Sequence, residues 1–460
     1  MSRTPNIIVF FSDDHAQWAL PSYGNSEIHA PNLTHLAQTG ILMQNAFTPC
    51  PVCSPARASF WTGLYPSQHG VHDHLAEDDM AVQAADWLAD TPLLAQRLQA
   101  AGYTTALTGK WHCGSGEIPK PGFDFWYSAW RKTPKYDSPI NKYSDQGAVV
   151  ELRGTDTQII SDAAVDFLRS RDRGKPFFLF VGYAATHNPW LNRPERLVSQ
   201  YRRATFRDIP DDIAYPFGAA GRHPIAPDDP REARAQYYAS VTMIDAGVGR
   251  MLDELDAQGE RDDTLIVYTS DHGLNLGHHG LWGKGNGSEP LNMLEESIRV
   301  PLIANWPGVI AGGTRRAEFV SHCDLHATLL DIAGAEPTDR AGLPGRSAKA
   351  ILLGEPGGDW RNVYIGEYGT TRAIRDERYK LVCRAEQGDL LHDLIADPRE
   401  TVNLIDDDDR RHIADSLRAQ LDAFFARYQV AEHSGLRGDK LPIHNRREAW
   451  RTEKAAHHLN

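Results

Sequence analysis

The sequence predicts a doubly wound α/β fold, in which helices pack on both faces of a mostly parallel sheet. Three short apolar runs support this, at Asn6 to Phe11, Pro176 to Tyr183 and Thr264 to Thr269. They are too short for helices and apolar on both faces, which is typical of strands buried in a parallel sheet. Segments with helical periodicity lie between them, and this alternation indicates strand–helix–strand units.

The helices predicted between these strands carry apolar residues on one face. They cover Leu93 to Ala101, Thr157 to Leu168 and Ala235 to Leu255, where apolar side chains recur at helical spacing. Two stretches rich in proline and charged residues interrupt the pattern, at Thr133 to Ser144 and Asp208 to Arg231. We expect long irregular insertions there, and such insertions are often functional.

The sequence pattern changes after Gly345 and predicts a smaller α+β unit there. Val363 to Glu367, Thr371 to Ile374 and Tyr379 to Val382 have the pattern of short antiparallel strands, and Asp406 to Tyr428 that of a helix. The acidic start of this helix lacks the spaced ligands and the glycine of an EF-hand loop, so we interpret it as a solvated helix N-terminus. The predicted domains are an α/β domain over 1–355, an α+β subdomain over 356–432 and a polar tail over 433–460. We expect this tail to pack on a neighbour or to be mobile.

Composition excludes several classes of function. The 460 residues carry a formal net charge of −13, which argues against nucleic acid as a partner. The same charge means that an anionic substrate must be held by local cations or a metal. The five cysteines are too scattered for a disulfide framework or a zinc finger. No apolar run could span a membrane and no secretory signal precedes the first strand, so we expect a cytoplasmic protein.

Polar residues follow the first and third of the predicted strands. Asp13 and Asp14 come directly after one, and Asp271 and His272 after the other. Because ligands of open parallel sheets bind beyond the carboxyl ends of the strands, these side chains should meet. Adjacent carboxylates repel each other, and a hard divalent cation relieves the repulsion. The sequence therefore predicts a metal site.

The segment from Cys53 to Arg57 has three interpretations. Cys53 could be a buried structural thiol, a thiolate nucleophile activated by a nearby cation, or a cysteine that is chemically converted before it acts. Other cations lie beside glycines, at Lys110 with His112 and at Lys284. Glycines let the backbone approach a ligand closely, so the pattern suits an anion site.

These motifs together resemble the sulfatase family. Cys53, Pro55 and Arg57 match its cysteine–proline–arginine signature. The other similar segments, in the same order as in the family, are Thr62 to Pro66 with His69 to Val71, Gly109 to His112, Thr186 and His187 with Pro189, Ser270 to Gly273 with Lys284, Arg299 to Ile303, and Arg378 to Leu381 with Asp397 to Leu404. The resemblance covers roughly residues 5 to 430, and several motifs in the right order make it specific.

The resemblance implies an alkaline-phosphatase-like fold, with a large mixed, mostly parallel sheet and a small C-terminal subdomain with a short antiparallel sheet. It implies a metal ion at Asp13, Asp14, Asp271 and His272, and conversion of Cys53 to formylglycine by a separate modifying enzyme. One hydroxyl of the hydrated aldehyde then attacks sulfur and expels the alcohol, and the other expels sulfate. Histidine at position 272 is more like bacterial sulfatases and the related phosphonate and phosphodiester hydrolases than like animal sulfatases, so we expect Ca²⁺ first and Mn²⁺ second.

Roles follow by position from the same resemblance. Arg57 and His112 hold the two hydroxyls, with His112 able to remove a proton. Lys110, His187 and Lys284 hold the sulfate oxygens, and His187 or Lys284 protonates the leaving oxygen. The metal acts as a Lewis acid. The residues expected to contact the leaving group are Trp111, Asn188, Trp190 and His279.

The sequence therefore predicts a sulfatase that hydrolyses a sulfate monoester of a sugar or of an aryl or alkyl alcohol. Two alternatives stay open. The first is a phosphonate monoester or phosphodiester hydrolase with the same nucleophile, and the second is a non-catalytic protein that binds a metal and an anion with Cys53 unmodified. The expected partners are a sulfated small molecule or short saccharide and the formylglycine-generating enzyme. The sequence assigns no oligomeric state.

Overall fold

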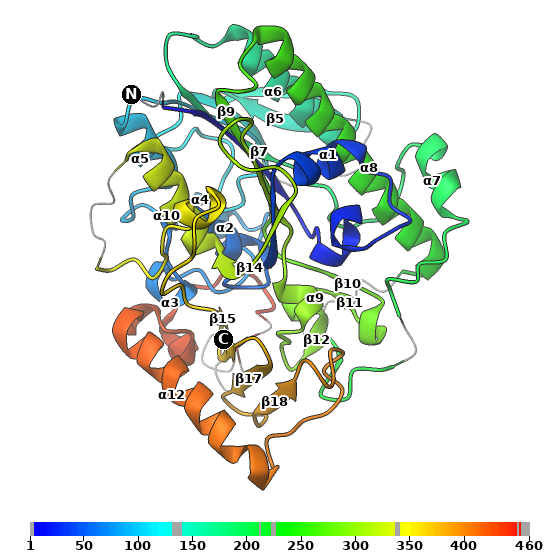
Figure 1. Cartoon of the computed structure of the whole chain (residues 1–460), viewed down its shortest axis with the longest axis vertical. Coiled ribbons are helices and arrows are strands. Elements are labelled where there is room, and N and C mark those ends of the chain that lie inside the picture. Colours follow the sequence, from blue (N-terminus) through cyan, green and yellow to red (C-terminus); the bar gives the residue numbers. More distant parts are fainter. Residues whose placement is uncertain are drawn as a thin grey trace.

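A computed structural model of the chain describes residues 4–130, 140–210, 213–221, 227–335, 341–448 and 450–451. Within these ranges the largest element is a sheet of ten strands, shown in Figure 1. From one edge to the other the strands are β14 (Thr314–Ser321), β2 (Ile41–Phe47), β13 (Leu302–Asn305), β9 (Thr264–Ser270), β1 (Asn6–Ser12), β7 (Phe177–Gly182), β3 (Thr104–Gly109), β4 (Phe125–Ala129), β5 (Asn141–Asp145) and β6 (Ala148–Leu152).

The middle of this sheet is parallel, as the apolar runs predict. Strands β9, β1, β7, β3 and β4 are parallel neighbours, β13 is antiparallel to both β9 and β2, and β5 and β6 form an antiparallel edge. Alternate residues of β1 enter two different cores: Ile8 and Phe10 lie in one, and Val9 and Phe11 in the other. A strand buried on both faces needs this continuous apolar sequence.

Helices cover both faces of the sheet (Figure 1). One core contains side chains of α1 (Pro31–Thr39), α6 (Asp156–Ser170), α7 (Glu195–Tyr201) and α8 (Pro230–Gln258). The other contains side chains of α2 (Cys53–Thr62), α4 (Met80–Ala84), α5 (Leu94–Ala100), α10 (His322–Ala333) and α11 (Lys349–Leu352). The three predicted helices are confirmed as α5, α6 and α8, each with slightly different ends. No helix among the described residues is long and apolar enough to cross a membrane.

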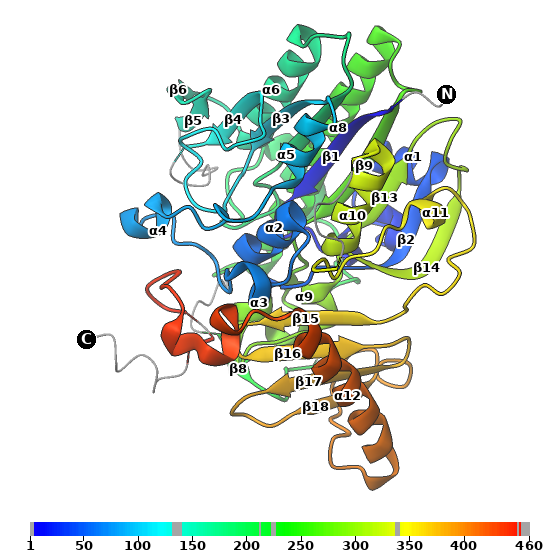
Figure 2. The same ribbon diagram turned by 90° about the vertical axis from the view of Figure 1, so that its left-hand side faces the viewer.

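A smaller unit follows at the C-terminal end of the chain and packs below the large sheet in Figure 2. Its antiparallel sheet consists of β15 (Tyr364–Tyr368), β16 (Thr371–Arg375), β17 (Tyr379–Arg384) and β18 (Leu390–Asp393), and it is covered by α12 (Arg411–Tyr428). The helix begins later than the sequence predicts. Asp407 accepts a hydrogen bond from the Asp409 backbone N–H, and a short 3₁₀ turn, η5 (Asp408–Arg410), precedes α12.

Both predicted insertions contain regular structure. Residues 141–144 of the first lie in β5, so this part of the prediction is wrong, and residues 131–139 are outside the described ranges. In the second, β8 (Ala219–Ala220) pairs with β12 (Ser288–Glu289), and α8 begins at Pro230. Residues 211–212 and 222–226 are not among those described.

The remaining short elements are α3 (Pro66–His69), α9 (Glu295–Ile298), β10 (Asn275–Leu276), β11 (Trp282–Gly283), η1 (Gln17–Ala19), η2 (Pro21–Tyr23), η3 (His278–Gly280), η4 (Gly285–Gly287), η6 (Ala431–His433) and η7 (Gly435–Lys440).

The C-terminal segment packs on its own chain rather than extending as a tail. Trp450 is buried, and its ring lies 5.4 Å from that of His72 and 5.9 Å from that of His444. The Nε2 atom of His72 lies 2.7 Å from the His433 carbonyl oxygen. The expectation of a mobile or neighbour-bound tail is therefore wrong for residues 433–448 and 450–451. Residues 452–460 lie outside the described part of the chain.

Helix α2, which begins at Cys53, is fixed against α10 by a buried histidine. His326 on α10 makes a hydrogen bond of 3.0 Å from Nδ1 to the Phe60 carbonyl oxygen, and its ring lies against Gly63 at the end of α2. Burial lowers the pKa of His326 to about 4. The folded protein therefore holds this imidazole neutral at neutral pH.

We expect the free energy of unfolding to fall as the pH is lowered, in part because of His326. Unfolded, this imidazole titrates near its usual pKa of about 6.5, so between that pH and about 4 the unfolded chain binds more protons than the folded one. Replacing His326 with Gln should reduce the slope of unfolding free energy against pH by up to about 1.4 kcal/mol per pH unit. Urea denaturation of both proteins from about pH 7 to about pH 5 measures the slope, and an unchanged slope would contradict the assignment.

Candidate active site

The predicted site residues lie at the carboxyl edge of four neighbouring strands of the central sheet. Strands β9 and β1 are paired in register up to their last residues, so the segments that follow them start side by side. The same edge receives the ends of β7 and β3. Asp13 and Asp14 follow β1, Asp271 and His272 follow β9, Lys110 and His112 follow β3, and His187 lies in the loop after β7.

The backbone turn after β1 makes the two adjacent carboxylates converge. Asp14 has a φ of 59°, in the left-handed region that aspartate tolerates better than most residues. Its carbonyl oxygen accepts hydrogen bonds from Thr186 Oγ1 at 3.0 Å and from Tyr237 Oη at 2.9 Å. These bonds hold the turn, and oxygen atoms of both Asp13 and Asp14 lie in one compact group with the Cys53 sulfur and a His187 nitrogen.

The four predicted metal ligands are brought together and fully buried. Potential ligand atoms of Asp13, Asp271, His272 and Cys53 all lie within 4.8 Å of one another. Among the described residues, the buried Asp14 Oδ2 has no hydrogen-bond partner. Buried carboxylate oxygens are rarely left unpaired, because desolvation without compensation is costly. The donor set of carboxylates and one imidazole therefore fits a divalent cation.

The orientation of His272 supports the same conclusion. Its Nδ1 atom lies 2.8 Å from the Gly273 carbonyl oxygen, which can only accept, so Nδ1 carries the proton of a neutral ring. Burial lowers the pKa of His272, which favours that neutral form. Nε2 then presents a lone pair to Asp14 Oδ1 at 3.3 Å and to Asp271 Oδ1 at 3.5 Å. Three acceptor atoms therefore face one another, an arrangement that a divalent cation between them would stabilise.

Three cations balance the three carboxylates of this cluster. Lys110 Nζ pairs with Asp13 Oδ2, Lys284 Nζ lies 2.7 Å from Asp14 Oδ1, and Arg57 Nε lies 3.1 Å from Asp271 Oδ2. The formal charges of these three pairs cancel, so a divalent cation would leave an excess positive charge that an anionic sulfate group can offset in part.

The pKa values of the three carboxyl groups differ: those of Asp13 and Asp14 are lowered, whereas burial and Asp13 raise that of Asp271. Burial raises the pKa of Asp13, but Lys110 and His187 outweigh burial and hold that pKa well below its usual range. Burial also raises the pKa of Asp14, and Lys284 is the largest influence that lowers it below its ordinary value. Both carboxyl groups are therefore ionised at neutral pH and available to a metal.

Cys53 is the first residue of α2 and lies inside the cluster. Its Sγ atom is 3.4 Å from Asp13 Oδ1, 3.3 Å from His272 Nε2 and 2.9 Å from Lys284 Nζ. The unpaired N–H groups at the start of a helix favour negative charge nearby. An oxygen at the position of this sulfur would touch metal ligands and a cation at once.

The two predicted catalytic histidines, His187 and His112, differ in their contacts and in the direction of their pKa shifts. His187 Nε2 is 4.0 Å from Asp14 Oδ2, and the side chain is 25% exposed. Burial lowers the pKa of His187, but Asp14 and Asp13 outweigh burial and raise it. His112 Nε2 contacts the Leu75 carbonyl oxygen at 3.2 Å. Its pKa lies well below the usual value because of burial and Lys110, and it shares a small cavity of about 20 Å³ with Lys110.

The residues predicted to contact the leaving group do not form one group. Trp111 lines the small cavity beside His112, but it also packs against Trp61 in the core. Trp190 is buried, donates from Nε1 to the Thr186 carbonyl oxygen at 3.0 Å and so helps to fix the His187 loop. In that loop the Asn188 carbonyl oxygen lies 2.7 Å from His187 Nδ1. His279 lines a different and larger cavity, about 290 Å³ in volume.

Sequence reasoning missed several residues that support the site. Glu77 and Trp130 line the small cavity with His112, and Glu77 Oε1 lies 3.8 Å from His112 Nε2. Arg193 donates from its guanidinium to the His187 carbonyl oxygen at 3.2 Å, and Tyr237 holds the turn at Asp14. No motif marks Glu77 or Trp130. Tyr237 lies in α8, and its place in the helical pattern indicates only that it is a core residue.

Comparisons with known proteins identify the family. The sulfatase family model matches residues 5–335, and the model described as N-sulphoglucosamine sulphohydrolase, C-terminal, matches residues 277–427. The chain is 29% identical to an N-acetylglucosamine-6-O-sulfatase of Bacteroides thetaiotaomicron, over 88% of this chain and 83% of that protein. It is 30% identical to a choline-sulfatase of Rhizobium meliloti, over 87% and 82%.

Solved structures confirm the predicted alkaline-phosphatase-like fold. The complex of BT4656 with its substrate D-glucosamine-2-N,6-O-disulfate superposes with a TM-score of 0.79 at 25% identity, over 93% of this chain and 98% of the other. Phosphonate monoester hydrolase of Agrobacterium radiobacter superposes with a TM-score of 0.74 at 24% identity, over 92% and 95%. Sulfatases generally use a formylglycine and a divalent metal, and the cluster at the sheet edge is a possible metal site. The chain belongs to the sulfatase family and is a sulfuric ester hydrolase.

Proposed function

We propose that this chain hydrolyses sulfate monoesters of small saccharides, using a formylglycine made from Cys53 and a bound calcium ion. The observation that carries the proposal is the position of the Cys53 sulfur, 3.4 Å from Asp13, 3.3 Å from His272 and 2.9 Å from Lys284. Similarity to an N-acetylglucosamine-6-O-sulfatase and to a protein solved with a disulfated glucosamine supports a saccharide substrate. From the sequence, we also propose that a separate formylglycine-generating enzyme matures the protein and that the protein is cytoplasmic.

The carboxylates of Asp13, Asp14 and Asp271 and the imidazole of His272 would hold the metal. When bound, it would supply Lewis-acid chemistry and lower the pKa of the attacking oxygen. Oxygen donors dominate this set, which favours calcium, and the single imidazole makes manganese the second candidate.

The cations around Cys53 would bind and orient the sulfate group. Lys110 and Lys284 are point charges with three donors each, and both are nearly buried beside the cluster. His187, at the more exposed side, supplies a further donor. These three groups can each meet one non-bridging oxygen of a sulfate monoester. Arg57 is held by Asp271 and donates to the Lys110 carbonyl oxygen, so it is fixed where it can orient the group derived from Cys53.

The two histidines suit opposite proton transfers. Asp14 and Asp13 raise the pKa of His187, which favours a protonated ring that can donate a proton to the departing alcohol oxygen. The lowered pKa of His112 keeps it neutral, so it can accept a proton. Two groups whose pKa values are shifted in opposite directions are the expected pattern for an acid and a base.

Replacing Cys53 with Ala should lower the hydrolysis of a chromogenic aryl sulfate by at least about a thousandfold, because the attacking group is removed. Steady-state rates are measured with the modifying enzyme co-expressed and calcium supplied. Cys383→Ala is a matched control, since Cys383 is another free cysteine, on β17 of the C-terminal sheet.

Peptide mass spectrometry of the active protein complements the rates, because it distinguishes an aldehyde from a thiol at position 53. Near-normal turnover in Cys53→Ala would overturn the proposal. A thiol at position 53 in fully active protein would do the same.

Chelation of the metal should abolish activity, and added Ca²⁺ should restore it at lower concentrations than Mn²⁺. Asp14→Asn should raise the calcium concentration needed for half-maximal activity by at least about tenfold, since an amide is a weaker ligand than a carboxylate. Titrating each metal into chelator-treated protein gives both values. Full activity in chelated protein would show that the cluster holds no essential ion.

Aryl sulfate monoesters should be hydrolysed with a higher kcat/KM than aryl phosphodiesters or phosphonate monoesters. A sulfate monoester has three non-bridging oxygens for Lys110, Lys284 and His187, whereas each of the other two esters has only two, which leaves one of these three donors without a substrate oxygen. Initial rates on matched nitrophenyl esters decide the order. A higher kcat/KM for the phosphodiester would favour the alternative hydrolase.

A further inference from the structure

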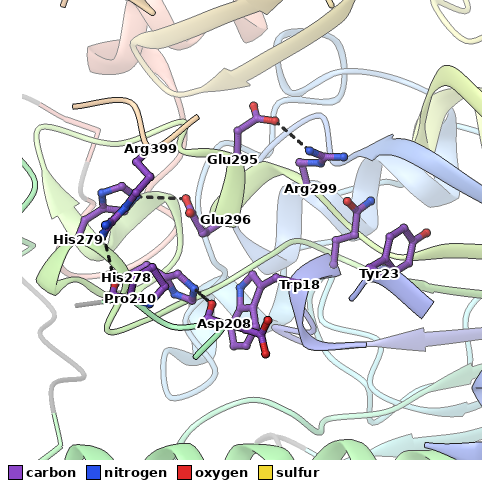
Figure 3. Close-up of a pocket in the computed structure, with 11 residues that line it drawn as sticks. Trp18, Tyr23, Asp208, Pro210, His278, His279, Glu295, Glu296, Arg299 and Arg399 are labelled. Atoms are coloured by element: carbon purple, nitrogen blue, oxygen red, sulfur yellow. Dashed lines mark hydrogen bonds and ion pairs between the residues drawn. The ribbon is translucent and has the colours of Figure 1, made fainter. Parts of the chain in front are cut away.

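The larger of the two cavities described above, which His279 lines, includes none of the residues of the metal cluster. It has a volume of about 290 Å³ and lies between η1, η2, η3, α9 and the loop that carries Arg399 (Figure 3). It is close to the lower end of the range for ligand pockets, roughly 300 Å³. Its lining residues are Gln17, Trp18, Tyr23, Asp208, Pro210, His278, His279, Glu295, Glu296, Arg299 and Arg399.

Several buried polar atoms on the lining residues have no hydrogen-bond partner within the described chain. They are Asp208 Oδ2, His279 Nδ1 and Arg299 Nε; the buried Glu295 Oε2 and Glu296 Oε2 instead lie in ion pairs. Each buried and unsatisfied polar group costs roughly 1–3 kcal/mol, so a native structure pairs such groups with water or a ligand. The concentration of these atoms around one cavity indicates that a polar molecule belongs there.

The charges of the lining exclude a strongly charged ligand. Glu296 Oε2 lies 3.4 Å from His279 Nε2, and Glu295 Oε2 lies 3.6 Å from Arg299 NH1, so the carboxylates already face cations. Burial lowers the pKa of His279, but Glu296 outweighs burial and raises it, which favours a protonated ring. An anion would meet Asp208 and both glutamates, and a cation would meet Arg299, Arg399 and the protonated histidine. The ligand that fits is uncharged.

The aromatic residues of the cavity offer only carbon surface. The indole N–H of Trp18 already donates to the Leu274 carbonyl oxygen at 3.0 Å. The hydroxyl of Tyr23 donates to the Met43 carbonyl oxygen at 2.8 Å and accepts from the Leu302 N–H at 2.9 Å. Each has its polar group engaged elsewhere, so the exposed part of the ring can contact only apolar atoms.

A ligand must therefore be uncharged, carry apolar C–H surface, and both donate and accept hydrogen bonds. Carboxylate oxygens of Asp208, Glu295 and Glu296 accept, while Arg299 Nε and the protonated His279 Nδ1 donate. Sugar hydroxyls do both, and the C–H face of a sugar ring packs against an aromatic ring. We propose that this cavity is a binding site for an uncharged sugar residue, separate from the reacting centre. The proposal does not depend on the sulfatase reaction.

Binding of unsulfated sugars to the catalytically inactive Cys53→Ala protein tests the inference. We expect at least one of glucose, galactose and N-acetylglucosamine to bind saturably, with a Kd on the order of 1 mM, as measured by ligand-observed NMR titration. Glucosamine and glucuronate, the charged counterparts, should bind at least about tenfold more weakly, because each meets like charges. Saturable binding of none of the three neutral sugars would overturn the proposal, as would tighter binding of a charged one.

Two variants locate the binding in this cavity. Asp208→Asn and Glu296→Gln keep the side-chain volume but remove a charged acceptor, and each should weaken binding of the neutral sugar about tenfold. Asp253→Asn, an exposed aspartate on α8, is the matched control and should leave the Kd unchanged. The same three substitutions made with Cys53 intact should retain aryl sulfate hydrolysis, which shows that they fold. If both cavity variants bind the sugar as tightly as the control, the sugar binds elsewhere and the assignment is wrong.

Discussion

The burial of three carboxylates at the ends of adjacent strands is the constraint on which the rest of the site depends. Asp13, Asp14 and Asp271 are fully buried, and an uncompensated buried carboxylate costs several kcal/mol. The chain meets this constraint with Lys110, Lys284 and Arg57, which come from three other segments. The strand ends fix where the carboxylates lie, and the carboxylates fix where the cations must lie.

The parts of the site that could best be predicted from the sequence are those whose position is set by the strands of the sheet. Asp13 and Asp271 come immediately after continuous apolar runs, and parallel strands carry their carboxyl ends to one edge, so their meeting could be expected without any relative. The role of Cys53 could not be obtained in this way, because a buried thiol and a precursor of formylglycine have the same local sequence. That prediction depended on the family resemblance. Strand β5, which lies between β4 and the edge strand β6, was missed because most of its residues are polar, which gives no continuous apolar run.

The C-terminal segment shows a second limit of sequence reasoning. Its polar composition predicts a tail, yet the segment is fixed by buried polar contacts: His444 accepts a hydrogen bond from the His72 N–H at 3.0 Å, and its carbonyl oxygen accepts one from the Ala76 N–H at 2.8 Å. The loop held in this way includes Leu75, whose N–H donates to Ser54 on α2 and whose carbonyl oxygen contacts His112. Specific polar pairs between distant segments leave no periodic signal in the sequence.

The reversed direction of β13 has a consequence for how such enzymes can diversify. Because β13 runs against its neighbours, the segment that precedes it, α9, lies at the carboxyl edge of β9 rather than at the opposite edge of the sheet. Glu295 on α9 is held there by Lys380 at 3.1 Å and Arg375 at 3.2 Å from the C-terminal sheet. One helical turn thus links the two units, beside a hydrophobic cluster that they share, which includes Phe47, Ile298 and Tyr364. An evolving lineage could exchange the loops of the smaller unit and reshape the neighbouring cavity, while the reacting centre on the larger unit stays intact.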